Sequence, residues 1–407
     1  MRVLYAPVYQ GFQVALADIF GQGVPADKVI QRQLKLNKKW GSHDRRLFAE
    51  GLYDIVRWWR RLLYACEVPW PKADRFEHVD PQVLAAVTGA WCELHEVELG
   101  KNIPRPHSQA NVKRLWNEAQ APRAVRQSIP DWLDAWGSEQ LGEAWESRLT
   151  ILNQQAPVFL RANRLKITAP ALVRSLAGEK IMAEAVGDDA VRLVNRANVF
   201  LTRSFKDGFF EVQDLHSQAV ARALDPQPGE RVIDACAGGG GKSLHAAALM
   251  GNKGRLLALD VVELKLKQLK LRAKRAGASC IETRVIESSK VIKRLAGSAD
   301  RLLLDVPCSG LGVLRRTPDS KWRLKGEEIQ RLHSLQTEIL SGYPVMLRPG
   351  GRLVYATCSL MPAENQRVVE AFLSRNEAAF TLEKQETLGP TAEGGDGFFI
   401  AVLNKKA

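Results

Sequence analysis

The sequence predicts a parallel, doubly wound α/β domain over residues 213–407, preceded by a small α/β module over residues 151–212 and a helical region over residues 1–150. From about residue 229, short apolar runs alternate with helical spans, which is typical of a parallel sheet covered by helices on both faces. Residues 157–212 show short apolar runs around a single helical span, whereas the first 150 residues show apolar side chains at helical spacing.

The composition is that of a globular protein with an excess of positive charge. Hydrophobic residues make up 45% of the 407 residues and charged residues 25%, and this length corresponds to two or three domains. No apolar stretch approaches the ~18 residues of a membrane-spanning helix, and the N-terminus lacks a signal-peptide pattern, so we expect a cytoplasmic protein. The 58 basic and 45 acidic residues give a net charge of +13, which favours a polyanionic partner such as nucleic acid. Six scattered cysteines without a CxxC pair predict free thiols and no metal site.

The helical pattern is clearest over residues 42–63, where Ser42 or Asp44 is the expected N-terminal cap. The apolar side chains at helical spacing are Phe48, Leu52, Ile55, Val56, Trp59 and Leu62. The arginines between them are Arg45, Arg46, Arg57, Arg60 and Arg61. We interpret this pattern as a core-facing stripe with a solvated basic back rather than as an RNA-contacting face.

Strands and helices of the other two regions follow from their apolar runs. In the small module we expect strands at 159–163, 191–194 and 199–202, with a helix from Pro170 to just before Gly178. The strands expected in the large domain are 231–235, 255–259, 281–285, 301–304, 352–356 and 398–403. The helices expected between them include 263–276 and 363–375. Because ligands of such sheets bind beyond the carboxyl ends of the strands, functional residues are sought just after each run.

A glycine-rich turn, DACAGGGGKS, follows the first of these strands. Glycine lets the backbone adopt positive φ and approach a ligand closely. A phosphate-binding P-loop requires glycine where Cys236 stands, and a dinucleotide pattern that starts at Gly238 ends on Ser243. Since both patterns fail at one residue, we expect an adenosine-containing cofactor without a pyrophosphate. The candidate cofactor contacts in this turn are Cys236, Ala237, Gly238, Gly239, Gly240, Gly241 and Lys242.

Two acids follow the next strands. Asp260 ends the second strand, at the position where an acid can accept hydrogen bonds from both hydroxyls of a ribose. Glu287 follows the third strand and is either the next polar contact to the nucleoside or an ordinary loop acid.

Two cysteines follow the fourth and fifth strands. Asp305 and Cys308 lie just after the fourth strand, and Cys358 lies just after the fifth. A structural disulfide is not expected in a reducing compartment, and most free cysteines are small apolar filler. Cys308 and Cys358 differ from the other cysteines because both follow strands at the edge of the sheet where a ligand is expected to bind, and Asp305 lies at the same edge.

Residues 157–404 resemble the RNA cytosine-C5 methyltransferases of the Sun/Fmu (RsmB-like) family. The glycine turn is similar to that family's Cys-Ala-Ala-Pro-Gly-Gly-Lys signature, residues 305–310 resemble its fourth motif, and residues 356–359 its sixth. The helical region is similar to a NusB-like RNA-binding extension, and the small module is RRM-like. The chain departs from the pattern at Gly238-Gly239, which replaces Ala-Pro, and at Glu287, which replaces Asp.

The resemblance implies a Rossmann-like, seven-stranded class I methyltransferase domain that uses S-adenosyl-L-methionine to methylate carbon 5 of cytosine in RNA, most often ribosomal RNA. Carbon 5 is too electron-poor to attack a methyl donor until a thiolate adds to carbon 6. The resemblance assigns that nucleophile to Cys358 and the base that removes the carbon-5 proton to Cys308. It assigns to Asp305 a contact with the cytosine ring and the cofactor.

A target base must be single-stranded or flipped out to meet a thiol, and its phosphates need cations nearby. We expect these contacts from Arg315, Arg316 and Lys321, which crowd the loop after the fourth motif. Transfer RNA as substrate, a P-loop-type NTPase and a non-catalytic RNA-binding ribosome-assembly factor are the alternatives.

Overall fold

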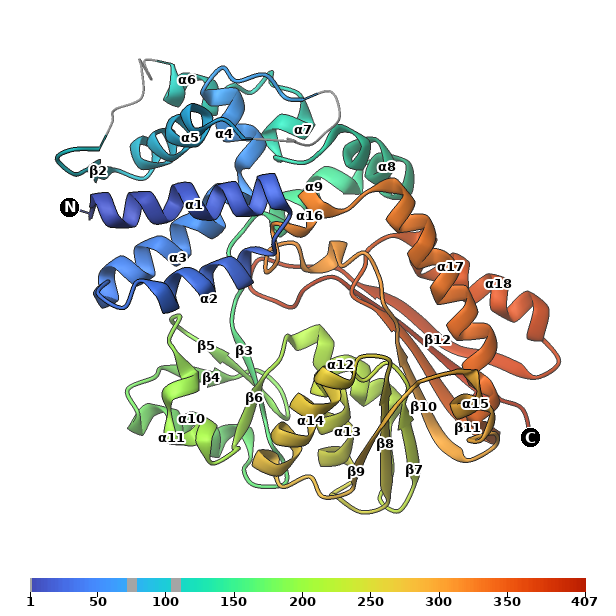
Figure 1. Cartoon of the computed structure of the whole chain (residues 1–407). Coiled ribbons are helices and arrows are strands. Elements are labelled where there is room, and N and C mark those ends of the chain that lie inside the picture. The colour runs from blue at the N-terminus through green and yellow to red at the C-terminus, as the bar shows by residue number, and fades with distance from the viewer. Residues whose placement is uncertain (1, 72–78, 104–110) are drawn as a thin grey trace. The chain divides into compact units, whose positions relative to one another are not determined.

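A computed structural model describes residues 2–71, 79–103 and 111–407 (Figure 1). The chain divides into two compact units. The first unit holds Met1–Gln155 together with Leu314–Gly326, and the second holds Ala156–Val313 and Glu327–Ala407. The helical unit therefore includes the segment Leu314–Gly326, although the sequence predicts that this segment belongs to the C-terminal domain.

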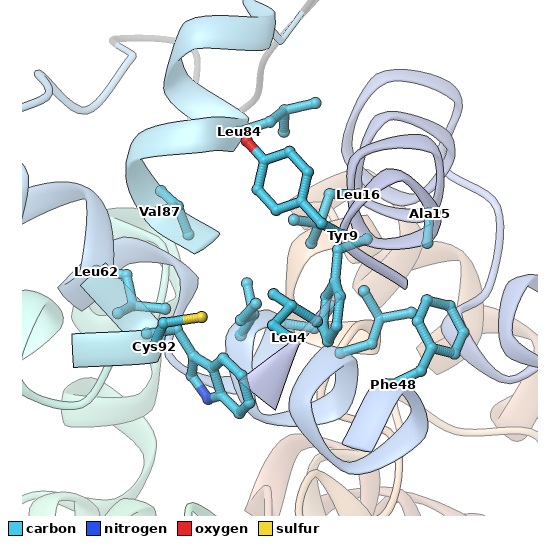
Figure 2. Packing of buried hydrophobic residues seen from close by; sticks show 14 of the residues in the cluster. Leu4, Tyr9, Ala15, Leu16, Phe48, Leu62, Leu84, Val87 and Cys92 are labelled. Carbon is cyan, nitrogen blue, oxygen red and sulfur yellow. The ribbon is translucent and has the colours of Figure 1, made fainter. Parts of the chain in front are cut away.

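The first unit is helical, with one small parallel pair of strands. Its elements are β1 (Arg2–Leu4), α1 (Ala6–Gln22), α2 (Ala26–Leu36), α3 (Ser42–Arg57), α4 (Trp59–Ala65), α5 (Pro81–Leu94), β2 (Val97–Leu99), α6 (Val112–Trp116), α7 (Arg123–Arg126), α8 (Asp131–Leu141), α9 (Ala144–Leu152) and α16 (Ser320–Arg323). Figure 2 shows Leu16, Phe48, Leu84 and Val87 from α1, α3 and α5 directed into a shared apolar core. Burial of these side chains is the main stabilising contribution to such a bundle.

The span 42–63 forms two helices that break at Trp58, and its apolar stripe is buried as expected. The expected cap is wrong, because Gly41 precedes α3 and no side chain caps the helix. The solvated basic back is also wrong for Arg60 and Arg61. Arg60 donates to the carbonyl oxygen of Ile129 at 2.7 Å, and Arg61 donates to that of Trp116 at 2.6 Å. These arginines are thus used inside the helical unit to satisfy loop carbonyls that would otherwise lack donors.

The segment 314–326 is built into the same helical unit. The indole N–H of Trp322 donates to the carbonyl oxygen of Val56 at 2.7 Å, and Nζ of Lys321 donates to that of Arg57 at 2.8 Å. Lys321 is 1% exposed and Arg315 is 2% exposed. The expectation that Lys321 and Arg315 contact phosphate is therefore wrong in this conformation, because both side chains are buried. Arg316 is half-buried, and its phosphate contact stays a prediction.

The small module contains a four-stranded antiparallel sheet in the order β4-β5-β3-β6. Its elements are β3 (Phe159–Ala162), α10 (Ala169–Gly178), β4 (Ala183–Ala185), β5 (Ala190–Leu193), η1 (Val199–Leu201), α11 (Arg203–Lys206) and β6 (Phe210–Val212). The strand expected at 199–202 is instead the 3-10 turn η1. The side chain of Asn198 accepts a hydrogen bond from the backbone N–H of Phe200 and so favours a turn over an extended chain.

The large sheet has seven strands in the order β12-β13-β11-β10-β7-β8-β9. Strands β9, β8, β7, β10 and β11 are parallel, and β13 runs antiparallel to both β11 and β12. The strands are β7 (Arg231–Asp234), β8 (Arg255–Asp260), β9 (Ile281–Val285), β10 (Ala299–Asp305), β11 (Leu347–Thr357), β12 (Phe380–Leu388) and β13 (Phe398–Lys405). The expected doubly wound α/β sheet is confirmed. Strand β12 was missed because this edge strand, FTLEKQETL, is mostly polar.

Helices cover both faces of this sheet (Figure 1). The helices packed on one face are α12 (Leu215–Leu224), α13 (Gly241–Leu249) and α14 (Glu263–Ala276). Those on the other face are α15 (Ser289–Lys293), α17 (Gly326–Gly342) and α18 (Gln366–Asn376). Short 3-10 turns, η2 (Leu311–Val313), η3 (Tyr343–Met346) and η4 (Pro362–Glu364), connect the strands to these helices. The buried layers fix the strands, so the loops at their carboxyl ends start from defined positions.

We expect Trp322→Ala to destabilise the helical unit, because the substitution removes a large ring packed near Phe20 and the hydrogen bond to Val56. The expected loss in the free energy of unfolding is about 3 kcal/mol. Urea denaturation followed by circular dichroism measures it, with Lys325→Ala in the same segment as the exposed control. Equal denaturation midpoints for the two variants would show that the segment does not stabilise the unit.

Candidate active site

The glycine turn between β7 and α13 is shaped by residues with positive φ. Gly240 caps α13 at a φ of 81°, and a Cβ there would lie 2.3 Å from Cγ of Leu269. Gly238 also has positive φ, at 54°. Any side chain at position 240 would displace the buried Leu269, so this position requires glycine. The backbone N–H groups of Ala237 and Gly240 are bonded to the carbonyl oxygens of Leu259 and Ala237, so the turn has a fixed shape at the amino end of α13.

Asp260, at the end of β8, is bonded to the glycine turn. One carboxylate oxygen accepts from the backbone N–H of Gly238 at 2.8 Å, and the other accepts from that of Val262 at 2.8 Å. The structure thus brings Asp260 and the glycine turn together. Glu287 is exposed after β9, and its contact with a cofactor stays a prediction.

Two arginines that the sequence analysis missed hold the carbonyl groups of the glycine turn. Arg161, on β3 of the small module, donates to the carbonyl oxygen of Gly241 at 2.7 Å, and Arg272, on α14, donates to that of Gly239. Glu211, on β6, accepts from Arg272 at 2.9 Å. These bonds restrain a turn in which Gly238-Gly239 leaves the backbone flexible. No local pattern reveals them, because the partners are 33 to 80 residues apart in the chain.

Asp234 provides a buried acceptor beneath the same turn. Burial raises the pKa of its carboxyl to about 7, although the Ser243 hydroxyl donates to Oδ2 at 2.6 Å and opposes that shift. A hydrogen bond from the backbone N–H of Cys236 opposes the shift as well. Asp234 is 2% exposed, so it supports the glycine turn from beneath.

Lys242 and Asp305 link the glycine turn to β10. The Lys242 ammonium lies 2.7 Å from Oδ2 of Asp305. Burial disfavours the charged ammonium, but the neighbouring Asp305 carboxylate outweighs this and raises the pKa of Lys242 overall. The pair is thus a salt bridge at the carboxyl end of the sheet, and it fixes the position of the Asp305 side chain at the end of β10.

The two cysteines that follow β10 and β11 meet at the same edge. Their sulfur atoms, Sγ of Cys308 and Sγ of Cys358, are 3.4 Å apart, and both thiols are free. The hydrogen bond to Cys358, followed by burial, raises the pKa of the Cys308 thiol well above its usual value. Cys308 therefore keeps its proton in the resting state. Two free thiols in contact at the edge of the sheet that also carries Asp305 could supply a nucleophile and a proton acceptor.

Gly312 joins the loops that carry this pair. Its backbone N–H donates to the carbonyl oxygen of Cys358 at 2.9 Å, and its carbonyl accepts from Gly397 N–H at 2.8 Å. A Cβ at Gly312 would lie only 2.1 Å from the carbonyl oxygen of Gly397. The loops after β10 and β11 and the start of β13 are thus in direct backbone contact, which leaves no room for a side chain at this position.

Comparison with known proteins identifies the family. The model described as 16S rRNA methyltransferase RsmB/F matches residues 221–404, and the Methyltr_RsmF/B-like, ferredoxin-like domain model matches residues 129–200. A relative from Bacillus subtilis, named "Probable ribosomal RNA small subunit methyltransferase B", is 36% identical over 314 residues, which are 72% of this chain and 68% of the relative. The chain belongs to the RsmB/F methyltransferase family. The resemblance drawn from the sequence is confirmed.

Further relatives agree with this assignment. A Yersinia pseudotuberculosis protein named "Ribosomal RNA small subunit methyltransferase B" is 37% identical over 68% of this chain, and this chain spans 66% of that relative's length. A solved methyltransferase homologue from Pyrococcus horikoshii is 28% identical, covers 70% of this chain and 98% of its own, and has a TM-score of 0.62. The solved protein PH0851 shares the fold over 97% of this chain and 98% of its own, with a TM-score of 0.79 at 23% identity.

The cofactor of this RsmB/F methyltransferase is S-adenosyl-L-methionine, and the residues of the site fit it. The Asp260 carboxylate is bonded to the glycine turn at the end of β8, and the positive φ of Gly238 and Gly240 shapes that turn. Within the described ranges, no group of three or more His, Cys, Asp or Glu is arranged to hold a metal ion. No helix in those ranges is long and apolar enough to cross a membrane.

Gly312→Ala is expected to destabilise the protein by about 2 kcal/mol or more, the cost of overpacking where backbone cannot move aside. The reason is the 2.1 Å approach of the added Cβ to the Gly397 carbonyl oxygen. Thermal unfolding measures the loss. Gly342→Ala is the matched control, since no atom lies within 4 Å of its added Cβ. A melting temperature for Gly312→Ala equal to that of the control would contradict the tight contact between the loops.

Proposed function

We propose that this RsmB/F methyltransferase transfers a methyl group from S-adenosyl-L-methionine to carbon 5 of a cytosine in RNA through a covalent cysteine adduct. The observation that carries the proposal is the 3.4 Å contact between the sulfurs of Cys308 and Cys358 next to the Asp305–Lys242 pair. Relatives named for small-subunit ribosomal RNA make that RNA the favoured substrate. Transfer RNA remains the alternative that the substrate assay below separates.

Each residue of the site has a distinct task in this reaction. The thiolate of Cys358 adds to carbon 6 of cytosine, which makes carbon 5 nucleophilic. Ring nitrogen 3 takes up a proton from solvent as the thiolate adds, and the Asp305 carboxylate, held by Lys242, accepts a hydrogen bond from this N–H and stabilises the neutral adduct. The bound cofactor supplies the electrophilic methyl group. A proton acceptor then takes the carbon-5 proton, and the bond from Cys358 to carbon 6 breaks. This releases 5-methylcytosine and regenerates the Cys358 thiolate.

Cys308 is suited to the role of this proton acceptor. Its raised pKa makes its thiolate a strong proton acceptor, and the resting thiol releases its own proton to solvent before the thiolate accepts the carbon-5 proton. In the resting state the protonated Cys308 can donate a hydrogen bond to the sulfur of Cys358. The same contact therefore supports Cys358 as the nucleophile before addition and brings Cys308 next to the adduct after it.

The Asp260→Ala variant should bind S-adenosyl-L-methionine more weakly. The change removes an acceptor for ribose hydroxyls and the hydrogen bonds to Gly238 and Val262. Loss of hydrogen bonds to a charged group corresponds to about 1.5–3 kcal/mol, or about 10- to 150-fold in affinity. Calorimetric titration measures the change, with exposed Glu282→Ala on β9 as the control. Unchanged affinity in a folded Asp260→Ala protein would remove Asp260 from the cofactor site.

Replacement of each cysteine should arrest a different step. Cys358→Ala should neither methylate RNA nor form an adduct. Cys308→Ala should accumulate a denaturant-resistant protein–RNA complex that requires S-adenosyl-L-methionine, because the carbon-5 proton cannot leave. Denaturing gel electrophoresis with radiolabelled ribosomal or transfer RNA measures the adduct and compares the two substrates.

Two controls complete this experiment. The Cys308→Ala/Cys358→Ala protein should lack the adduct, and Cys280→Ala, which changes a half-buried thiol outside the site, should behave as the wild type. An adduct that survives in Cys358→Ala and vanishes in Cys308→Ala would reverse the two roles. Full methylation by both single variants would overturn the covalent mechanism.

A further inference from the structure

A single buried carboxylate contacts both of the loops that carry the cysteines. Glu364 lies in η4, six residues after Cys358, and is 0% exposed. Its Oε1 accepts from the backbone N–H of Ser309 at 2.8 Å and from the Gln336 amide at 3.0 Å. Its Oε2 accepts from the hydroxyls of Ser309 and Ser359, each at 2.5 Å.

The donors are the residues next to the reactive thiols. Ser309 directly follows Cys308, and Ser359 directly follows Cys358. The Gln336 amide also donates to the carbonyl oxygen of Pro307, the residue before Cys308, at 2.9 Å. One carboxylate therefore bonds to both the loop after β10 and the loop after β11, and each bonded serine directly follows one of the two cysteines.

The backbone of Glu364 is fixed as well. The hydroxyl of Tyr355, on β11, donates to its carbonyl oxygen at 2.7 Å. The neighbouring Asn365 accepts from the Thr357 hydroxyl at 2.5 Å and donates to the carbonyl oxygen of Ser359 at 3.0 Å. The carboxylate is thus held relative to the end of β11, so its bonds to Ser309 define the position of the other loop relative to that strand.

A fully buried carboxylate is costly to desolvate, and hydrogen bonds of this number and length are what make it tolerable. A pair of apolar side chains would fill the same space without that cost. The carboxylate does something that apolar packing cannot do: its directional bonds fix the distance between two separate loops.

We propose that Glu364 is the positioning residue that holds Cys308 and Cys358 in contact for the reaction. The expected effect of Glu364 on methyl transfer rests on the proposed function, whereas its effect on the position of the two thiols does not. Glu364 contacts neither substrate nor cofactor in this role; it acts through Ser309 and Ser359.

Two substitutions separate the geometry of Glu364 from its charge. In Glu364→Gln the amide oxygen can replace Oε1, and the amide nitrogen can replace Oε2, because serine hydroxyls accept as well as donate. All four contacts can then persist without the negative charge. In Glu364→Ala all four contacts are lost. Glu230→Ala is the matched control: it removes a carboxylate that bonds to Arg301 near the opposite end of β10.

Binding of phenylarsine oxide tests whether the thiols of Cys308 and Cys358 lie close together, and it does not require catalysis. Phenylarsine oxide condenses with two neighbouring thiols, so that two arsenic–sulfur bonds form and one water leaves, with no change of redox state. Only the part of the arsenical binding that is lost in Cys308→Ala is assigned to the Cys308–Cys358 pair. We expect tight binding in wild type, Glu364→Gln and Glu230→Ala, and affinity lower by about tenfold or more in Glu364→Ala, as for the loss of charge-assisted hydrogen bonds. Affinity in folded Glu364→Ala equal to that of the wild type would overturn the inference.

A second measurement detects a role that simple stabilisation would not produce. The hydrogen bond to Cys358, burial, and the nearby charges of Cys358 and Glu364 all raise the pKa of the Cys308 thiol. Alkylation of Cys308 by iodoacetamide, followed by mass spectrometry, should therefore shift to lower pH in Glu364→Gln while arsenical binding persists. An unshifted profile in Glu364→Gln would contradict direct contact between the carboxylate and the thiol loop.

Methylation assays then connect geometry with reaction. Glu364→Ala should lose methyl transfer while its affinity for S-adenosyl-L-methionine is retained, and Glu364→Gln should recover much of the rate. If Glu364→Ala does not fold, Ser309→Ala, which removes one bond to Oε2, should show the same direction with a smaller effect; wild-type arsenical affinity there would count against the inference. A wild-type protein that binds the arsenical but methylates no RNA would overturn the proposed function and leave the positioning role intact.

Discussion

The parallel register of β10 and β11 is the constraint on which the site depends. Asp305 pairs with Ala356 at the ends of the two strands, and the cysteines follow within three residues. Because side chains alternate between faces, a slip of one residue would send the following loops in different directions. The buried strands prevent such a slip, since Leu304 and Tyr355 are fully buried on the same register pair. Contact between two sulfurs from separate loops is thus a consequence of how the sheet packs.

Charge at the edge of the sheet is balanced locally. Lys242 neutralises Asp305, and Glu211 neutralises Arg272 beside the glycine turn. Buried ion pairs contribute little to net stability, because desolvation offsets their attraction, but they fix geometry when each partner is fully bonded. The Lys242–Asp305 pair joins α13 to β10, and the Glu211–Arg272 pair joins β6 of the small module to α14 within the same compact unit. The small module therefore helps to hold the glycine turn through Arg161 and Glu211.

The sequence predicted the parts of the site that lie directly after strands. The glycine turn, Asp260 and the two cysteines follow apolar runs, and a parallel sheet brings such positions to one edge whatever the loops do. It did not predict Arg161 or Glu364, because their roles depend on partners far along the chain. A buried polar residue carries no periodic signal, and its partner cannot be identified until the packing is known.

The net positive charge can be counted from the sequence, but the structure decides which basic side chains are exposed. An excess of 13 positive charges favours an RNA partner, but several of the basic residues that look suited to bind phosphate are used internally. Arg60 and Lys321 donate to backbone carbonyl oxygens, and Arg272 holds the glycine turn. A basic side chain that is held by backbone carbonyl oxygens within the protein is not available to contact a phosphate. The cations that can attract RNA are therefore those on exposed faces, such as Lys270 and Lys274 on α14, and net charge alone does not locate them.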